Sequence, residues 1–210
     1  MTPEPSPPLR NNFSLEPSTL DIEITDEEFN RIYPPKISKL AEKHFTPLAI
    51  AKAASEFLVT KPRARVLDIG SGAGKFCMVG ATHTQGHFTG IEQRSGLVEL
   101  SKNLSASYGI QNVTFLHMNV VSGDFHDFDS FYIYNSFYEN IDKHDRMDDA
   151  ILLTNQLYSS YLMYTKEQLS RAAPGARLAT FHTMRTIVPS DFMLIDSLHE
   201  AHLELWQKNQ

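Results

Sequence analysis

A glycine-rich loop directly after a short apolar run constrains the fold of this chain more than any other feature. The run ARVLDI (64–69) suits a buried parallel strand, and glycines stand at every second position of the loop that follows, Gly70–Gly74. Glycine lets the backbone turn sharply without a side chain between it and a ligand. The helix expected next, GKFCMVGAT, directs its N-terminal amides at that ligand. The loop therefore predicts an α/β domain with a binding site at this turn.

Apolar runs and amphipathic stretches alternate through the rest of the chain, as in folds with a parallel sheet covered by helices. Strands are expected at 87–92, 113–118, 131–135 and 176–182, with helices after the glycine loop, at 95–108 and along a stripe over 158–172. The last two runs, FMLIDSL and LELWQK, can pair with each other. We expect an α/β, Rossmann-like, seven-stranded and mostly parallel sheet with an antiparallel C-terminal hairpin and helices on both faces.

The N-terminal third divides the chain further. Residues 1–19 hold five prolines and few apolar side chains, which predicts a disordered tail. Residues 20–60 form a helical segment in this interpretation, with a capping box at Thr25 and Glu28, and residues 61–210 form the ligand-binding domain. Thr46 before Pro47 has two readings, a plain helix cap or a part of the ligand site.

Polar side chains end the first three expected strands in an order that fits a nucleoside bearing an amino acid. Asp68 can pair with an amino group, Glu92 can accept both hydroxyls of a ribose, and the amide of Asn119 can pair with an adenine edge. Lys75 stands where the dinucleotide spacing requires its third glycine, and the loop lacks the ending of a phosphate-binding P-loop. A nicotinamide-dependent dehydrogenase is therefore disfavoured.

The segments VLDIGSGAGKF and FTGIEQR resemble the cofactor half of class I S-adenosylmethionine (SAM)-dependent methyltransferases, a resemblance that extends from Thr46 to the C-terminus. It implies that SAM is the cofactor and that Glu92 holds its ribose. It also implies which residues surround the methionine part: Asp68, Gly70, Ser71, Gly72 and Gly74. The family usually has Asp after the third strand, where this chain has Asn119. In many members, the segment that corresponds to Thr46 lies over the cofactor carboxylate.

The end of the fourth expected strand is the candidate reaction site. Methyl transfer from a sulfonium depends mostly on positioning, and the amide of Asn135 can orient an amino group there while Tyr138 packs against it. The stretch YNSFYEN loosely resembles the N-P-P-Y loop of amino-group methyltransferases, and more closely the N-N-F loop of Rossmann-type histone lysine methyltransferases, the telomeric-silencing-disruptor family. Ser136 departs from both motifs, and no long basic arm is present, so histones are not inferred. Asn135 is expected to lie beside the sulfonium. In the structural alternative Asn135 only caps a turn, and Phe137 and Tyr138 are core residues.

Composition narrows the remaining choices. A formal net charge of −6 argues against a broad nucleic-acid surface, and no run is long and apolar enough to span a membrane. Histidines are scattered without metal-ligand spacing, so no metal is expected. The single cysteine, Cys77, is interpreted as a core residue. His182, at the end of the fifth strand, is either a substrate contact or structural. A cytoplasmic location is expected.

The function predicted from these residues is SAM-dependent N-methylation of a protein side chain or another amine, so a protein or small-molecule acceptor is favoured over nucleic acid. The alternatives are an RNA or small-metabolite methyltransferase and a non-catalytic SAM-binding regulatory protein. Residues 140–156 are polar at first and irregular, which favours a lid over the acceptor site.

Overall fold

The computed structural model describes residues 24–141, 147–148 and 151–210. The tail predicted at 1–19 and part of the lid predicted at 140–156 lie outside these residues. Within them the strands are β1 (Arg65–Ile69), β2 (His87–Glu92), β3 (Val113–His117), β4 (Ser130–Tyr134), β5 (Arg177–Phe181), β6 (Phe192–Leu198) and β7 (Leu203–Lys208). The helices are α1 (Asp26–Asn30), α2 (Pro35–Ser38), α3 (Ala41–His44), α4 (Leu48–Leu58), α5 (Lys75–His83), α6 (Ser95–Ser107) and α7 (Asn155–Ser170), with short 3₁₀ turns η1 (Val120–Ser122), η2 (Tyr138–Asn140) and η4 (Arg185–Ile187).

The described strands form a seven-stranded sheet in the order β3-β2-β1-β4-β5-β7-β6. The first five strands run parallel to one another, and β7 pairs antiparallel with both β5 and β6. This arrangement confirms the predicted sheet and its C-terminal hairpin. The strand order reverses between β1 and β4, and ligands of such sheets bind outside the carboxyl ends of the strands at this reversal.

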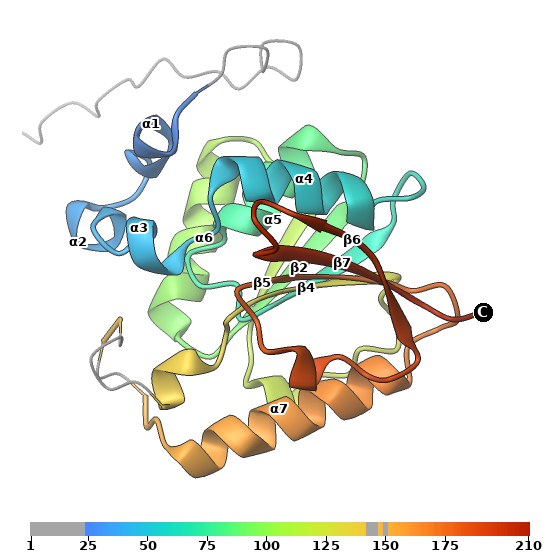
Figure 1. Cartoon of the computed structure of the whole chain (residues 1–210). Coiled ribbons are helices and arrows are strands. Elements are labelled where there is room, and N and C mark those ends of the chain that lie inside the picture. The colour runs from blue at the N-terminus through green and yellow to red at the C-terminus, as the bar shows by residue number, and fades with distance from the viewer. Residues whose placement is uncertain (1–23, 142–146, 149–150) are drawn as a thin grey trace, which may run out of the picture.

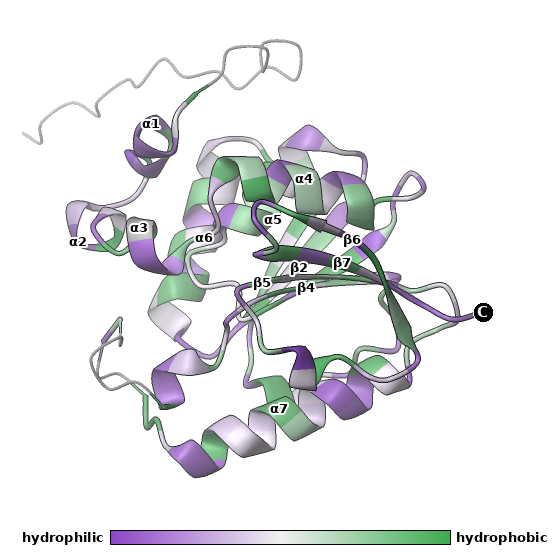
Figure 2. Cartoon of the chain, viewed as in Figure 1, coloured by the Kyte–Doolittle hydropathy of each residue, from purple (hydrophilic) through white to green (hydrophobic). Residues whose placement is uncertain are grey.

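Helices cover both faces of the sheet, as the alternating pattern predicts (Figure 1). Successive residues of β1 point to opposite faces of the sheet. Val66 belongs to a core shared with α4, α5 and α6, while Leu67 belongs to a core shared with α7. The central strands are largely hydrophobic, and the helices carry hydrophilic residues on the sides turned away from the sheet (Figure 2). Burial of apolar surface on both faces holds the strand ends, and thus the site, in fixed positions.

The segment α1–α3 packs beside the N-terminal ends of α4 and α5, and Asp26 connects all three parts. Its carboxylate accepts from the backbone N–H of Leu48 (3.0 Å) and forms an ion pair with the Nζ of Lys75. Asp26 therefore caps α4, and the prediction that Thr46 caps this helix is wrong. The N-cap is Pro47, without a side-chain hydrogen bond, and the hydroxyl of Thr46 instead contacts that of Tyr132 (3.0 Å).

Candidate active site

The loop between β1 and α5 forms the floor of a cleft at the carboxyl edge of the sheet. Gly70, Gly72 and Gly74 all have positive φ angles, which glycine adopts without strain. The backbone N–H groups of Gly70 and Ser71 donate to the carbonyl of Ile91 at 3.0 and 2.9 Å, so the loop is tied to β2. A Cβ at Gly72 would meet no atom within 4 Å. The backbone at Gly72 therefore faces open space that a ligand can enter.

The other glycines of this region make room for the protein's own side chains. A Cβ at Gly74, the N-cap of α5, would lie 2.6 Å from the ring of Phe115, so this glycine serves packing behind the cleft. A Cβ at Gly90, in the middle of β2, would lie 2.6 Å from the Cβ of Ser71. The side chain of Ser71 therefore packs over Gly90, and its Oγ is buried without a hydrogen-bond partner in the described structure.

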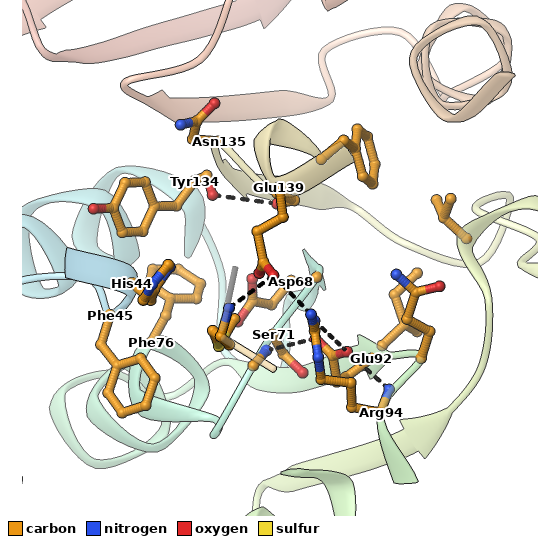
Figure 3. A pocket seen from close by; sticks show the side chains of 18 of the residues that line it. His44, Phe45, Asp68, Ser71, Phe76, Glu92, Arg94, Tyr134, Asn135 and Glu139 are labelled. Atoms are coloured by element: carbon orange, nitrogen blue, oxygen red, sulfur yellow. Dashed lines mark hydrogen bonds and ion pairs between the residues drawn. The ribbon is translucent and has the colours of Figure 1, made fainter. Parts of the chain in front are cut away.

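Asp68 at the end of β1 is a buried carboxylate in the wall of this cleft (Figure 3). The thiol of Cys77 donates to its Oδ2 at 3.4 Å, a contact the sequence interpretation of Cys77 as core did not include. Among the described residues, no cation neutralises Asp68. Burial raises the pKa of the Asp68 carboxyl to about 7, the Cys77 hydrogen bond opposes the rise, and the charge of Glu92 adds to it. The position is suited to a ligand that brings its own positive charge.

Glu92 at the end of β2 is buried, and each of its carboxylate oxygens accepts from a backbone N–H. Oε2 accepts from Gly72 at 3.1 Å and Oε1 from Arg94 at 2.8 Å. Burial raises the pKa of Glu92, while these two hydrogen bonds and the Arg94 charge lower it. An ionised carboxylate has about four acceptor positions, so Glu92 keeps capacity for two ligand hydroxyls.

Asn119 after β3 also lines the cleft, but its amide is engaged within the protein. Oδ1 accepts from the backbone N–H of Val121 (3.2 Å), and Nδ2 donates to the hydroxyl of Tyr161 on α7 (2.8 Å). The side chain thus caps the 3₁₀ turn η1 and reaches the helix on the opposite face. The prediction that this amide reads an adenine edge has no support from these contacts.

Thr46 and aromatic side chains close the opposite wall of the cleft, beyond Asp68. Tyr132 of β4 stacks on Phe76 of α5 with ring centroids 3.7 Å apart, and its hydroxyl meets Thr46. Tyr132 is buried, and burial raises the pKa of its phenol well above the usual value. His44, the last residue of α3, and Phe45, its C-cap, lie at the same wall (Figure 3). The structure thus places Thr46 at the cleft, and its contact with a ligand stays a prediction.

The turn after β4 lies directly against the glycine loop. The hydroxyl of Ser136 donates to the carbonyl of Ile69, and a Cβ at Gly70 would lie 2.7 Å from that of Ser136. Ser136, the departure from both family motifs, therefore anchors the turn to the glycine loop. Asn135 has a positive φ of 42°, and its backbone N–H donates to the Oγ1 of Thr183 at 3.0 Å.

The side-chain amide of Asn135 lines the cleft and has no hydrogen-bond partner among the described residues. The side chain of Asn135 therefore caps no turn, although Phe137 beside it is in the core, as the structural alternative expects. The role of Asn135 stays a prediction. Tyr138 also lines the cleft and is partly exposed. With Gly74 as the exception, the predicted site residues therefore share one cleft, whose empty volume is about 970 Å³ with the solvent at its mouth included.

Two charged residues of the cleft were absent from the sequence predictions. Arg94 follows β2 and is buried, and its guanidinium contacts Glu139 of η2. The residues lie 45 positions apart, so no local motif reveals the pair.

His182 has an exposed ring that packs on His202 with centroids 4.3 Å apart, and it is absent from the cleft lining. The described residues contain no cluster of three potential metal ligands.

Comparison with known proteins assigns a class to the central part of the chain. Residues 60–157, just under half of the chain, match the family model of a methyltransferase domain. The 23S rRNA (uracil(1939)-C(5))-methyltransferase RlmD of Klebsiella pneumoniae is 38% identical over 71 residues, which are 34% of this chain and 16% of RlmD. The chain therefore matches only about a sixth of the length of this curated relative.

Solved structures share the fold. TrmN from Thermus thermophilus superimposes with a TM-score of 0.56 at 15% identity, covering 82% of this chain and 52% of TrmN. An RNA methyltransferase from Salinibacter ruber, solved with S-adenosyl-L-homocysteine (SAH), has a TM-score of 0.54 at 16% identity and covers 79% and 94% of the two chains. The [4+2]-cyclase SpnF has a TM-score of 0.53 at 17% identity, with 75% and 60% covered.

Residues 60–157 thus match a methyltransferase domain, and the chain shares the Rossmann-like fold of neighbours that include a methyltransferase solved with SAH, the demethylated form of the cofactor SAM. The described cleft fits this cofactor on three observations. Gly72 leaves its floor open, Asp68 is a buried carboxylate without a cationic partner, and Glu92 has acceptor capacity for hydroxyls. The resemblance to histone lysine methyltransferases in particular has no counterpart among these comparisons. No helix in the described residues is long and apolar enough to cross a membrane.

Proposed function

We propose that this chain is a SAM-dependent methyltransferase that transfers a methyl group to an amine presented beside Asn135. The observation that carries the proposal is the unpartnered amide of Asn135, which lines the cleft in a turn clamped to the cofactor loop by Ser136. SAM, when bound, supplies an electrophilic methyl group on a sulfonium. In this proposal Asp68 binds the ammonium of its methionine part, and Glu92 accepts its ribose hydroxyls.

Asn135 orients the acceptor in this proposal. Its Oδ1 accepts a hydrogen bond from the acceptor amine, which directs the nitrogen lone pair at the methyl group. Thr183 holds the turn from the neighbouring strand end: its Oγ1 accepts from the Asn135 N–H and lies within hydrogen-bond distance of the carbonyls of Ile133 (3.1 Å) and Phe181 (2.9 Å). Tyr138 supplies an exposed ring at the mouth of the cleft, against which the acceptor packs.

Substitution of Asn135 by glycine tests this role without straining the backbone, because glycine tolerates the positive φ at this position. We expect Asn135→Gly to lower kcat about a hundredfold, as loss of one preorganised hydrogen-bonding group does, and to leave SAH affinity close to wild type. Asn103→Ala, on the exposed side of α6, is the control. Full activity of Asn135→Gly would move the acceptor away from this turn.

A nucleobase of RNA is the second candidate acceptor, because RlmD and the Salinibacter ruber neighbour act on RNA by name. Exposed Lys36 and Lys39 on α2 and the following turn offer a local positive surface, although the net charge is −6. A pyrimidine carbon is a weaker candidate. Such an atom needs activation by a nucleophile, and the one cysteine, Cys77, is buried with its thiol pKa raised well above the usual value.

The acceptor class can be assigned by methyl transfer from labelled SAM into cell lysate. The proposal predicts label that survives nuclease treatment. Protease should release the label if the acceptor is a protein, and ultrafiltration should remove it if the acceptor is a small amine. Label that disappears with ribonuclease would favour the RNA candidate. No label above that of a heat-denatured wild-type control in any fraction would contradict transferase activity and favour the non-catalytic alternative.

A further inference from the structure

Arg94 is a buried cation surrounded by carboxylates at the junction of the cofactor and acceptor sides of the cleft (Figure 3). Its side chain is 6% exposed. One NH group donates to Glu139 Oε2 at 2.7 Å, Nε donates to Asp148 Oδ1 at 3.0 Å, and a further guanidinium nitrogen lies 3.8 Å from Glu92 Oε1. One positive charge thus faces three acidic side chains from three separate parts of the chain.

We infer that Arg94 is a positioning residue that holds the acceptor turn against the ribose-binding carboxylate and keeps that carboxylate charged. The inference rests on the proposed function, in which Glu92 binds the cofactor ribose and the turn after β4 presents the acceptor. Arg94 acts through Glu92 and Glu139.

The electrostatic part follows from the groups that face Glu92. These are Arg94, which favours its ionised form, and Glu139, which opposes it. Asp68 lies in the same cleft, and the charge of Glu92 raises the pKa of the Asp68 carboxyl. Asp148 faces the same guanidinium. Burial weakens screening by water, so the balance among these charges is felt strongly. Without the guanidinium, Glu92 would keep its backbone hydrogen bonds but face only acidic side chains, and its pKa would rise further. A protonated carboxyl accepts fewer hydrogen bonds from hydroxyls than a carboxylate does.

The geometric part follows from Glu139. Its Oε2 accepts from both Arg94 and the backbone N–H of Met147, the latter at 3.1 Å. Glu139 belongs to η2, which follows Asn135 by a few residues, and Asn140 at the end of this turn bonds the carbonyl of Phe137. The ion pair therefore fixes the turn that carries the acceptor-orienting residues relative to β2.

Paired substitutions separate this role from simple stabilisation. We expect Arg94→Gln to weaken SAH binding about tenfold at neutral pH, the effect of losing a charge-assisted hydrogen bond. The difference in affinity between this variant and the wild type should narrow as pH rises. The double variant Arg94→Gln/Glu139→Gln should bind SAH more tightly than Arg94→Gln alone, because the repulsion on Glu92 is relieved. Arg94→Lys keeps the charge and should bind nearly as well as wild type.

Hydrogen exchange supplies the second readout. Glu139→Gln alone should bind SAH close to wild type while its amides at 137–141 exchange faster. Arg171→Gln, which breaks an exposed ion pair with Glu167 on α7, is the matched control and should change neither readout. Wild-type protein that fails to bind SAH would overturn the proposed function. Wild-type binding together with unchanged affinity in Arg94→Gln, or a double variant no better than the single one, would overturn the role of Arg94. If Arg94→Gln does not fold, the other two variants still test the role of Arg94. Wild-type exchange rates at 137–141 in Glu139→Gln, or a tenfold loss of SAH affinity in Arg94→Lys, would contradict that role.

Discussion

Asp68 shows how one residue's surroundings specify a ligand. A carboxylate removed from water is costly unless a cation or hydrogen bonds compensate it. Within the described structure its one hydrogen bond comes from Cys77, at 3.4 Å, and Glu92 adds repulsion. The balance is unfavourable to the charged form in the free protein, and a ligand ammonium would reverse it. The cleft is therefore built for a ligand charge at this position.

The first prediction concerns the pH dependence of Asp68. In the folded protein the Asp68 carboxyl has a pKa of about 7, whereas in the unfolded chain its pKa is near the ordinary value of 3.8. Deprotonation therefore favours the unfolded state over this window, and the stability of the free protein falls as pH rises from about 4 to about 7. SAH affinity should rise over the upper part of the same window. Asp68→Asn should bind SAH weakly at every pH and lose its share of the stability change, as calorimetry and melting curves would show. Equal pH profiles in both proteins would contradict this.

The second prediction concerns Gly90. Its missing Cβ makes room for Ser71, at a projected 2.6 Å, so Gly90→Ala should displace the cofactor loop and weaken SAH binding. Gly96→Ala is the matched control, because a Cβ there meets nothing within 4 Å. Alanine also has a higher helix propensity than glycine, which stabilises α6 by up to about 1 kcal/mol. Melting curves and SAH titration compare the two. Unaltered binding in Gly90→Ala would show that the loop position does not matter.

At the residue scale, the sequence predicts positions better than contacts. Asp68, Glu92 and Asn135 could be placed in one site because parallel strands bring their carboxyl ends to one edge. Asn119 could also be placed there, but its partner Tyr161 lies 42 residues away on α7, and this distant contact determines where its amide points. The pairing of Arg94 with Glu139 could not be predicted from the sequence either, because the two residues are 45 positions apart.

At the scale of elements, α1–α3 illustrates how a distant residue replaces a local cap. The capping box of Thr25 and Glu28 is present as the sequence predicts. A Thr-Pro pair likewise predicts a cap on α4, but Asp26 supplies that hydrogen bond from 22 residues away and frees Thr46 to meet Tyr132. The strands and longer helices were predictable because their periodicity reflects burial on two known faces.

The third prediction tests this connection. Asp26→Ala removes the ion pair with Lys75, whose side chain is 3% exposed, and the side-chain cap on α4. Loss of such a cap costs about 1 kcal/mol, or about 2–4 °C in Tm for a chain of this size. The buried ammonium of Lys75, left without the Asp26 carboxylate, adds to the loss. Asp127→Ala, which breaks only exposed contacts with Arg65 and His126, should melt like the wild type. Equal melting of the two variants would show that α1 is loosely attached.

At the scale of the whole molecule, the strand order decides where chemistry takes place. The order reverses between β1 and β4, so the cofactor loop and the Asn135 turn meet at one point, and Ser136 joins them. The fold itself does not fix the reaction, since a [4+2]-cyclase shares it at a TM-score of 0.53. The division of the chain at residues 19 and 60 stays a prediction, as does the cytoplasmic location.

The most direct test of the central claim is calorimetric titration of the wild-type protein and of Asp68→Asn with SAH, with NADH as the competing ligand class. The account predicts that SAH binds the wild type in a one-to-one complex, that Asp68→Asn weakens this binding by about tenfold or more, and that NADH gives no saturable heat. Saturable binding of NADH without binding of SAH, or equal SAH affinity in the two proteins, would contradict it.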